Sequence, residues 1–253
     1  MATLLRSHHL RLMNIDSAGA MLKTPKTSNE YSAVALLLID VINDLDFQEA
    51  EALLRQGLPM AHHLAALKAE AGRLKIPIIY VNDNFGHWKS DFRHIVEHCC
   101  GEGSRGAEIS RMLRPAEPDY FVLKPKHSGF YATTLDVLLK YLQIETLILT
   151  GVAANICVLF TANDAYMRDY NIAVPGDCVA ANTAEEKDYS LRQIKNLLKG
   201  DIRQSTEINL AALKSLNPTA AALPTTNLRW RNRTANVAQA QGISDKTIVS
   251  RCS

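Results

Sequence analysis

The sequence has 253 residues, of which 47% are hydrophobic and 21% are charged, and its formal net charge is +2. This composition is ordinary for a folded globular chain and excludes wholesale disorder or a fibrous architecture. The net charge is too small for a nucleic-acid surface, which needs basic residues concentrated on one face. The longest apolar runs, such as 33–39, are far shorter than the roughly 20 residues that cross a bilayer. We therefore expect a small-molecule partner, with no nucleic acid and no membrane.

The two ends of the chain differ in composition from its middle. Residues 1–30 are weakly basic and contain serine and threonine, which faintly resembles an organelle transit peptide, but they form no clean amphipathic helix. We interpret them as a flexible extension. Residues 214–253 lose the strand and helix pattern and predict a disordered tail. One domain is therefore expected, over 31–213.

The cysteines indicate a reducing compartment. They are odd in number and show no framework spacing, unlike the cysteines of a small disulfide-bonded protein. We accordingly expect a cytoplasmic protein. The five are Cys99, Cys100, Cys157, Cys178 and Cys252.

Short aliphatic runs alternate with longer helical patterns along the domain, which is typical of βαβ units around a parallel sheet. The runs are almost continuously apolar, as expected for strands that are covered on both faces. The five predicted strands are Val34–Ile39, Ile76–Val81, Tyr120–Leu123, Thr146–Thr150 and Ile172–Val174. Helices are predicted over Gln48–Leu74, Thr133–Leu142, Ile156–Asp169 and Glu185–Leu198, where apolar residues recur three and four apart.

Three reactive side chains stand just beyond predicted strands, where open α/β sheets bind their ligands. Asp40 and Lys124 each follow an apolar run directly, and Cys157 lies at the predicted start of a helix. Singly, an Asp here is more often a helix cap, a Lys is usually solvated, and a Cys is usually part of the core.

The combination of the three points to nucleophilic catalysis. A thiol needs a base to become a thiolate, and a nearby cation and a helix amino terminus stabilise the negative charge. Asp40 would accept the thiol proton, Lys124 would pair with that carboxylate, and Cys157 would attack a carbonyl carbon. Backbone N–H groups at the helix start would receive the oxyanion.

Motifs over about residues 33–205 resemble the isochorismatase-like cysteine hydrolases, which include nicotinamidases, N-carbamoylsarcosine amidohydrolases and ureidoacrylate amidohydrolases. The matching segments are Leu-Ile-Asp40-Val-Ile-Asn43-Asp44, Val-Leu-Lys124-Pro-Lys126-His-Ser128-Gly-Phe130, Thr-Gly151-Val-Ala153-Ala-Asn-Ile-Cys157-Val, Thr161-Ala-Asn-Asp164-Ala and Asp177. The resemblance implies a three-layer α/β/α Rossmann-like fold with a six-stranded parallel sheet.

The resemblance also implies the chemistry. Its triad is Asp40, Lys124 and Cys157, and a non-proline cis peptide just before Ala153 aims the oxyanion-hole amides of Ala153 and Cys157. The implied activity is cleavage of a C–N bond other than a peptide bond in a small amide-like substrate. We expect no cofactor and no metal, and a homodimer or homotetramer.

Two lysines compete for the family role, and we assign it to Lys124 because the family's lysine is the first of a Lys-x-basic-x-Ser-x-Phe run. For substrate contacts we nominate Asn43, Asn84, Trp88, Phe130 and Tyr131. Phe130 and Tyr131 have an alternative role, which is to pack against the next helix.

The chain departs from the family pattern at two places. Ile42 replaces a common Gln near the base, and Asn84 stands where metal-dependent nicotinamidases carry their first metal-binding His, which argues against nicotinamide as the substrate. His94 and His98 have zinc-like spacing beside Cys99, although a polar helix over the pocket is the simpler interpretation. Two other functions stay open: a vinyl-ether-cleaving isochorismatase, and a catalytically inactive binding or oligomerisation module.

Overall fold

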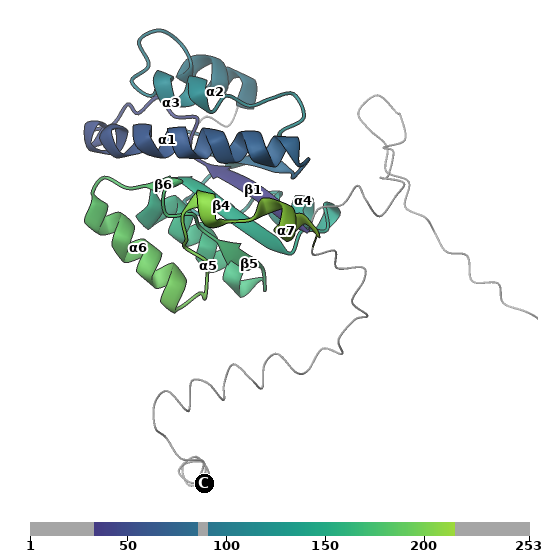
Figure 1. Ribbon diagram of the computed structural model, residues 1–253. Helices are drawn as coiled ribbons and strands as arrows, with labels where there is room; N and C mark the ends of the chain where they lie inside the picture. Colours follow the sequence, from purple (N-terminus) through teal and green to yellow (C-terminus); the bar gives the residue numbers. More distant parts are fainter. Residues whose placement is uncertain (1–32, 86–90, 216–253) are drawn as a thin grey trace, which may run out of the picture. The chain divides into compact units, whose positions relative to one another are not determined.

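The computed structural model describes residues 33–85 and 91–215 (Figure 1). The predicted N-terminal extension lies outside the described residues, as does all of the predicted tail except residues 214 and 215. In the described part, no helix combines the length and apolar character needed to cross a membrane.

The strands form a six-stranded, wholly parallel sheet in the order β3-β2-β1-β4-β5, with β6 also paired to β4. Their bounds are β1 Val34–Ile39, β2 Ile78–Asp83, β3 Tyr120–Lys124, β4 Thr146–Val152, β5 Asn171–Ala173 and β6 Val179–Ala180. The predicted fold class is thereby confirmed. Because parallel strands share one direction, the carboxyl ends of β1, β2, β3 and β4 lie at the same edge.

The helices cover both faces of this sheet. Their bounds are α1 Ala50–Arg73, α2 Phe92–Cys99, α3 Ala107–Met112, α4 Leu135–Tyr141, α5 Leu159–Met167, α6 Ala184–Asn196 and α7 Leu210–Ser215. A π-helical turn, η1 (Ala154–Val158), leads into α5, and a 3-10 turn, η2 (Ser205–Glu207), precedes α7. In Figure 1, α1, α2 and α3 lie on one side of the sheet, and α5 and α6 lie on the other.

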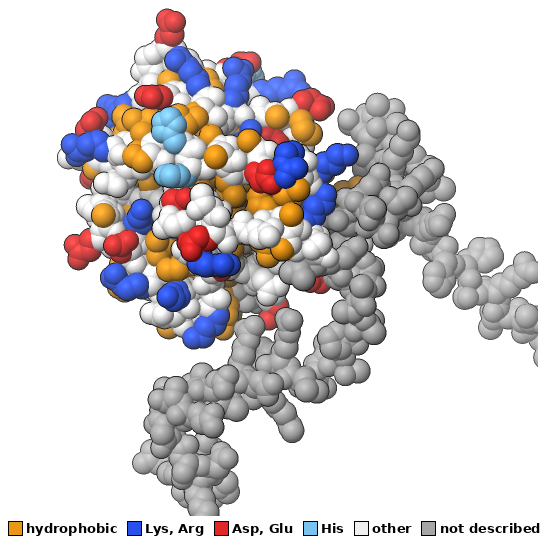
Figure 2. All heavy atoms as spheres, in the orientation of Figure 1, with side chains coloured by type: hydrophobic (Ala, Val, Ile, Leu, Met, Phe, Trp, Pro, Cys, Tyr) orange, Lys and Arg blue, Asp and Glu red, His pale blue; other side chains and the backbone are white. Residues whose placement is uncertain are grey.

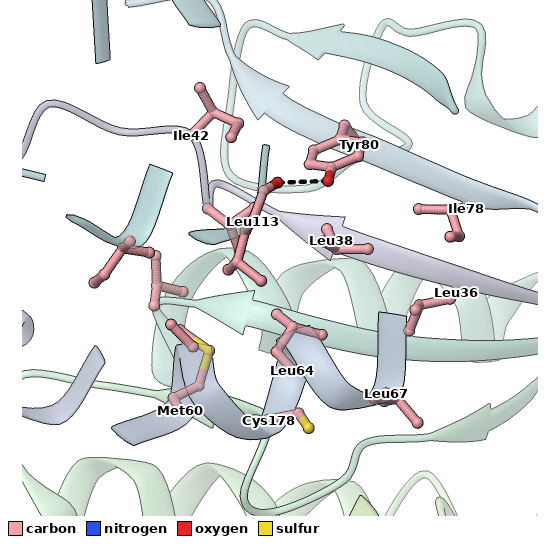
Figure 3. Packing of buried hydrophobic residues seen from close by; sticks show 14 of the residues in the cluster. Leu36, Leu38, Ile42, Met60, Leu64, Leu67, Ile78, Tyr80, Leu113 and Cys178 are labelled. Atoms are coloured by element: carbon pink, nitrogen blue, oxygen red, sulfur yellow. Dashed lines mark hydrogen bonds between the residues drawn. The ribbon is translucent and has the colours of Figure 1, made fainter. Parts of the chain in front are cut away.

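Alternation along β1 divides the core into two clusters, because successive strand side chains point to opposite faces. Leu36 and Leu38 join the cluster under α1, α2 and α3, whereas Leu37 and Ile39 join the cluster under α4, α5 and α6. Figure 3 shows part of the first cluster, in which the buried Tyr80 hydroxyl donates to the Leu113 carbonyl at 2.6 Å. Burial of both faces explains why the sequence of β1 is apolar at every position.

The predicted strand Ile76–Val81 begins two residues before β2 does in the structure. The Pro77 carbonyl accepts a hydrogen bond from the Leu36 N–H, but Pro77 has no N–H group to donate in return. The strand therefore begins at Ile78. At the other end the polar residues Asn82 and Asp83 continue the ladder, opposite Leu123 and Lys124 of β3. A polar pair therefore extends this strand into the edge where the reactive residues gather.

Gly151 permits the close approach of β4 to β1 at this edge. Its φ is +104°, and a Cβ atom there would lie 2.1 Å from the carbonyl oxygen of Ile39. Only glycine meets both conditions, since other residues rarely adopt such a φ and have a side chain to accommodate.

Acidic and basic side chains both occur on the face of the molecule that Figure 2 displays. Charge on this face is therefore mixed.

Candidate active site

Four polar side chains meet at the carboxyl edge of the sheet. Asp40 directly follows β1, Asp83 ends β2, Lys124 ends β3, and Cys157 lies in η1, just after β4. The strand order places these ends side by side, so residues more than a hundred positions apart in the chain converge.

The three residues predicted as a triad are within interaction distance. Lys124 Nζ lies 2.8 Å from Asp40 Oδ2 and 3.5 Å from Cys157 Sγ. The Asp40 carboxylate also acts on the Cys157 thiol, whose pKa it raises. Acid, cation and thiol thus form one continuous group.

The Lys124 side chain is completely buried, which is rare for a lysine unless its charge is paired. Burial lowers its pKa, but the negative charges of Asp40, Cys157 and Asp83 oppose this and leave the pKa raised above its ordinary value. The ammonium form is therefore favoured. Lys126, the competing lysine, has an exposed side chain.

Asp40 is held in a defined orientation. Its φ is +50°, in the left-handed region that few residues other than glycine adopt, and its backbone N–H donates to the Val81 carbonyl at 3.0 Å. Its Oδ1 accepts from the Asp83 N–H at 2.7 Å, while Oδ2 faces Lys124. Burial raises the pKa of Asp40, and the Lys124 charge and these hydrogen bonds act against that rise.

Cys157 lies in the first turn of a helix that starts as a π-turn. The Val158 N–H donates five residues back, to the Ala153 carbonyl at 3.2 Å, where an α-helix would donate four residues back. Burial and the Asp40 carboxylate raise the pKa of this thiol to about 12, against the opposing effect of Lys124. At neutral pH the resting group is therefore a thiol beside a buried carboxylate.

The pKa alone does not single out Cys157, because burial also raises the pKa of Cys99 and of Cys178 to about 12. What separates Cys157 from them is its pairing with a lysine and a carboxylate at the edge of the sheet.

The peptide bond between Val152 and Ala153 is cis, as the family resemblance implied. Ala153 follows β4 directly and precedes η1, so its backbone N–H and that of Cys157 belong to the short segment that surrounds the thiol.

Most of the described chain matches a known family. Residues 34–205, which include β1 through α6, match the Isochorismatase domain. The chain belongs to the isochorismatase family.

Relatives named below each match about two thirds of this chain. The chain is 43% identical over 174 residues to the uncharacterized isochorismatase family protein YaaI of Bacillus subtilis, covering 69% of this chain and 95% of that protein. It is 29% identical over 173 residues to an Arabidopsis thaliana protein named "Probable inactive nicotinamidase", covering 64% of this chain and 88% of the other. Among solved structures, N-carbamoylsarcosine amidase from Thermoplasma acidophilum has a TM-score of 0.55 and 31% identity, covering 70% of this chain and 98% of that one.

The residues nominated for substrate contact lie in different surroundings. Asn43 Oδ1 accepts from the Leu45 N–H at 2.8 Å, which shapes the loop after β1. Asn84 is buried and its N–H donates to the Lys124 carbonyl at 3.2 Å. Trp88 falls outside the described residues, and substrate contact for these three stays a prediction.

The two aromatic nominees also differ from each other. Phe130 is buried in the second core cluster, with the Arg168 guanidinium 4.7 Å from its ring centre, which favours the packing alternative. Tyr131 is 60% exposed and therefore accessible to a ligand.

Ile42 and the two histidines with zinc-like spacing each have defined surroundings in the structure. Ile42 is fully buried in the first core cluster, where Figure 3 labels it. His98 Nε2 lies 3.0 Å from Asp44 Oδ2, and His94 Nδ1 lies 3.5 Å from Asp91 Oδ1. Because the two histidines pair with different carboxylates and Cys99 is buried in the core, the described residues assemble no zinc-binding group there.

Two residues at this edge were not predicted from the sequence. Asp83 lies 3.5 Å from Lys124 Nζ, and the buried Asn82 side chain bonds to both the N–H and the carbonyl of Ile42. The signal that found Asp40 and Lys124, a polar residue just after an apolar run, also applies to both.

Proposed function

We propose that the protein is a cysteine hydrolase that cleaves a C–N bond of a small amide, ureide or carbamoyl compound through a thioester intermediate. The observation that carries this proposal is the position of Lys124 Nζ, 2.8 Å from Asp40 and 3.5 Å from Cys157. A binding module needs no such buried cation between a carboxylate and a thiol. The named amidase among the relatives supports the same class of reaction.

In the first half-reaction the Asp40 carboxylate takes the proton from Cys157 Sγ as the thiolate forms a bond to the carbonyl carbon. The carbonyl electron pair moves onto oxygen, where the N–H groups of Ala153 and Cys157 would stabilise it. As the C–N bond breaks, Asp40 returns the proton to the departing nitrogen, which leaves an acyl group on sulfur.

In the second half-reaction Asp40 takes a proton from a water molecule, and the water oxygen attacks the thioester carbon. The C–S bond breaks, the acid product leaves, and the thiolate recovers its proton from Asp40. Lys124 keeps its charge throughout, so it balances the negative charge that moves between Asp40 and Cys157.

The test is a panel of small amides, ureides and N-carbamoyl amines, with ammonia release as the readout and mass spectrometry to find an acyl adduct on Cys157. We expect Cys157→Ala to abolish both turnover and adduct, and the control Cys100→Ser to retain both. A Cys157→Ser variant with full turnover alongside an inactive Asp40→Asn variant would instead support vinyl-ether hydrolysis, which needs an acid but no covalent nucleophile. Labelling confined to Cys99 or Cys178 would overturn the assignment of the nucleophile.

Cellular location and assembly form part of the same proposal. The described cysteines are all free, which fits a reducing compartment such as the cytoplasm. We propose a homodimer or homotetramer, which light scattering of the purified chain would distinguish from a monomer.

A further inference from the structure

Lys124 has a second acidic neighbour in addition to the proposed base. Asp83 Oδ2 lies 3.5 Å from Lys124 Nζ, and the Asp83 side chain is 37% exposed, whereas that of Asp40 is 7% exposed. The lysine is therefore shared between a buried carboxylate and one that reaches solvent.

The strand order explains why a second carboxylate is placed there. Lys124 is on β3 and Asp40 follows β1, so the lysine side chain must pass the end of β2, with neighbouring strands about 4.8 Å apart. Asp83 is the residue of β2 that pairs in register with Lys124. Its carboxylate thus lies along the path that the lysine takes.

Hydrogen bonds hold both the side chain and the backbone of Asp83. Its Oδ1 accepts from the Phe85 N–H at 2.7 Å, and its own N–H donates to Asp40 Oδ1 at 2.7 Å. Asp40, Lys124 and Asp83 therefore form a closed ring of interactions, of which the cation is the shared member.

An ammonium group has three N–H donors, and here three acceptors surround it. They are Asp40 Oδ2, Asp83 Oδ2 and Cys157 Sγ. Without Asp83, one donor would lose its partner and the positive charge would act more strongly on the thiol.

We propose that Asp83 is a positioning residue of this active site: it holds Lys124 between base and nucleophile, and it moderates the positive charge that Cys157 experiences. This inference rests on the proposed function, because it takes the roles of Lys124 and Cys157 from there. Asp83 acts through Lys124 and touches neither the sulfur nor the scissile bond.

The charged groups around the lysine come from three neighbouring elements. Asp40 follows β1, Asp83 ends β2 and Cys157 lies in η1, and all three raise the Lys124 pKa. On its own loop, Lys126 and His127 have exposed side chains. Removing the Asp83 charge therefore removes one of the two carboxylates that pair with this cation.

The test uses iodoacetamide, which needs no natural substrate, because a thiolate displaces iodide and forms an S–C bond. The rate of Cys157 alkylation is measured by mass spectrometry between about pH 7 and pH 9 for the wild type and Asp83→Asn. We expect the variant to react about tenfold faster at each pH, since the Lys124 charge is then shared with one fewer carboxylate and shifts the thiol titration down by about one pH unit. Asn keeps a side-chain oxygen that can accept from Lys124 Nζ, so this variant removes the Asp83 charge while leaving the lysine a hydrogen-bond partner.

Two controls separate a charge effect from loosening of the fold. Asp136→Asn removes a carboxylate from a surface pair with Lys140 and should leave the rate unchanged. The buried Cys99 and Cys178 should stay unlabelled in every variant, because labelling there would report opening of the core. If Asp83→Asn does not fold, Asp83→Ser removes the same charge and keeps an oxygen for the Phe85 N–H.

An alkylation rate that is unchanged or slower in a folded Asp83 variant would overturn the inference. That result is distinguishable from failure of the proposed function: the latter appears as wild-type protein that turns over no amide, ureide or carbamoyl compound. Faster alkylation in the variant supports the role of Asp83 whichever substrate the enzyme is found to use.

Discussion

Lys124 Nζ and Asp40 Oδ2 are 2.8 Å apart, although β2 lies between the strands that carry these two residues. Both side chains are almost entirely removed from solvent, at 0% and 7% exposure. Charges in such a place are costly to desolvate, and each stabilises the other only while both are present. This interdependence makes the pair testable.

Lys124→Met should destabilise the protein by about 3–5 kcal/mol, because it leaves the Asp40 carboxylate buried without its cation. The free energy of unfolding from urea denaturation is the measurement. Adding Asp40→Asn to Lys124→Met should recover part of the loss, since the uncompensated charge is then gone. Strictly additive effects of the two substitutions would contradict a coupled pair.

Asp40→Asn should lower kcat by about 10²–10⁴, the range associated with loss of a general base. In the wild type, catalysis needs the carboxylate form, which is lost as pH falls through the Asp40 pKa. Because burial raises that pKa, the acidic limb of the kcat/KM profile should lie above about pH 3.9, where an ordinary Asp titrates. An acidic limb at or below that pH would argue against Asp40 as the base.

Gly151→Ala should cost more than about 3 kcal/mol, beyond the range of ordinary substitutions. The added Cβ would lie 2.1 Å from the Ile39 oxygen and would require a residue other than glycine at φ +104°. Gly72→Ala is the matched control: it lies in α1, has nothing within 4 Å of an added Cβ, and should stabilise by about 0.5–1 kcal/mol. The thermal unfolding midpoints of both variants measure this difference. Equal changes in stability for the two variants would contradict the prediction.

Asn82→Leu should destabilise by at least about 2 kcal/mol, because it leaves the N–H and the carbonyl of Ile42 without their side-chain partner in the core. Turnover should fall as well, since Asp40 begins the loop that Asn82 holds. Asn163→Ala is a suitable control, because the exposed Asn163 amide donates to only one carbonyl on α5. Its loss should change the free energy of unfolding by less than about 0.5 kcal/mol. A stable, fully active Asn82→Leu variant would show that the loop needs no such support.

The sequence was most informative where burial leaves a periodic or continuous apolar pattern. The bounds of β1 were predicted correctly from its six apolar residues, and α1 was predicted to within two residues at each end. Elements too short to show a pattern were missed: α3 and α7 have six residues each, and β6 has two. The sixth strand was expected from the family resemblance alone.

At the site, the sequence identified side chains but not their geometry. Asp40, Lys124 and Cys157 were recognised because each follows an apolar run, and their convergence depends on the strand order, which local sequence does not encode. The helix at Cys157 was predicted to begin at Ile156, whereas it begins as a π-turn at Ala154. Apolar spacing of three and four residues cannot distinguish a π-turn from an α-helical one.

Lys124 belongs to the last strand at one edge of the described sheet, since β3 pairs with β2 and lies at the end of the strand order. Edge elements open in local fluctuations that cost less than global unfolding. Detachment of β3 would carry the ammonium away while Asp40 and Cys157, which follow the central strands β1 and β4, stayed in place. The proposed hydrolase activity would then be lost at denaturant concentrations that leave the circular dichroism nearly native, and amide hydrogen exchange in β3 would report the same opening event.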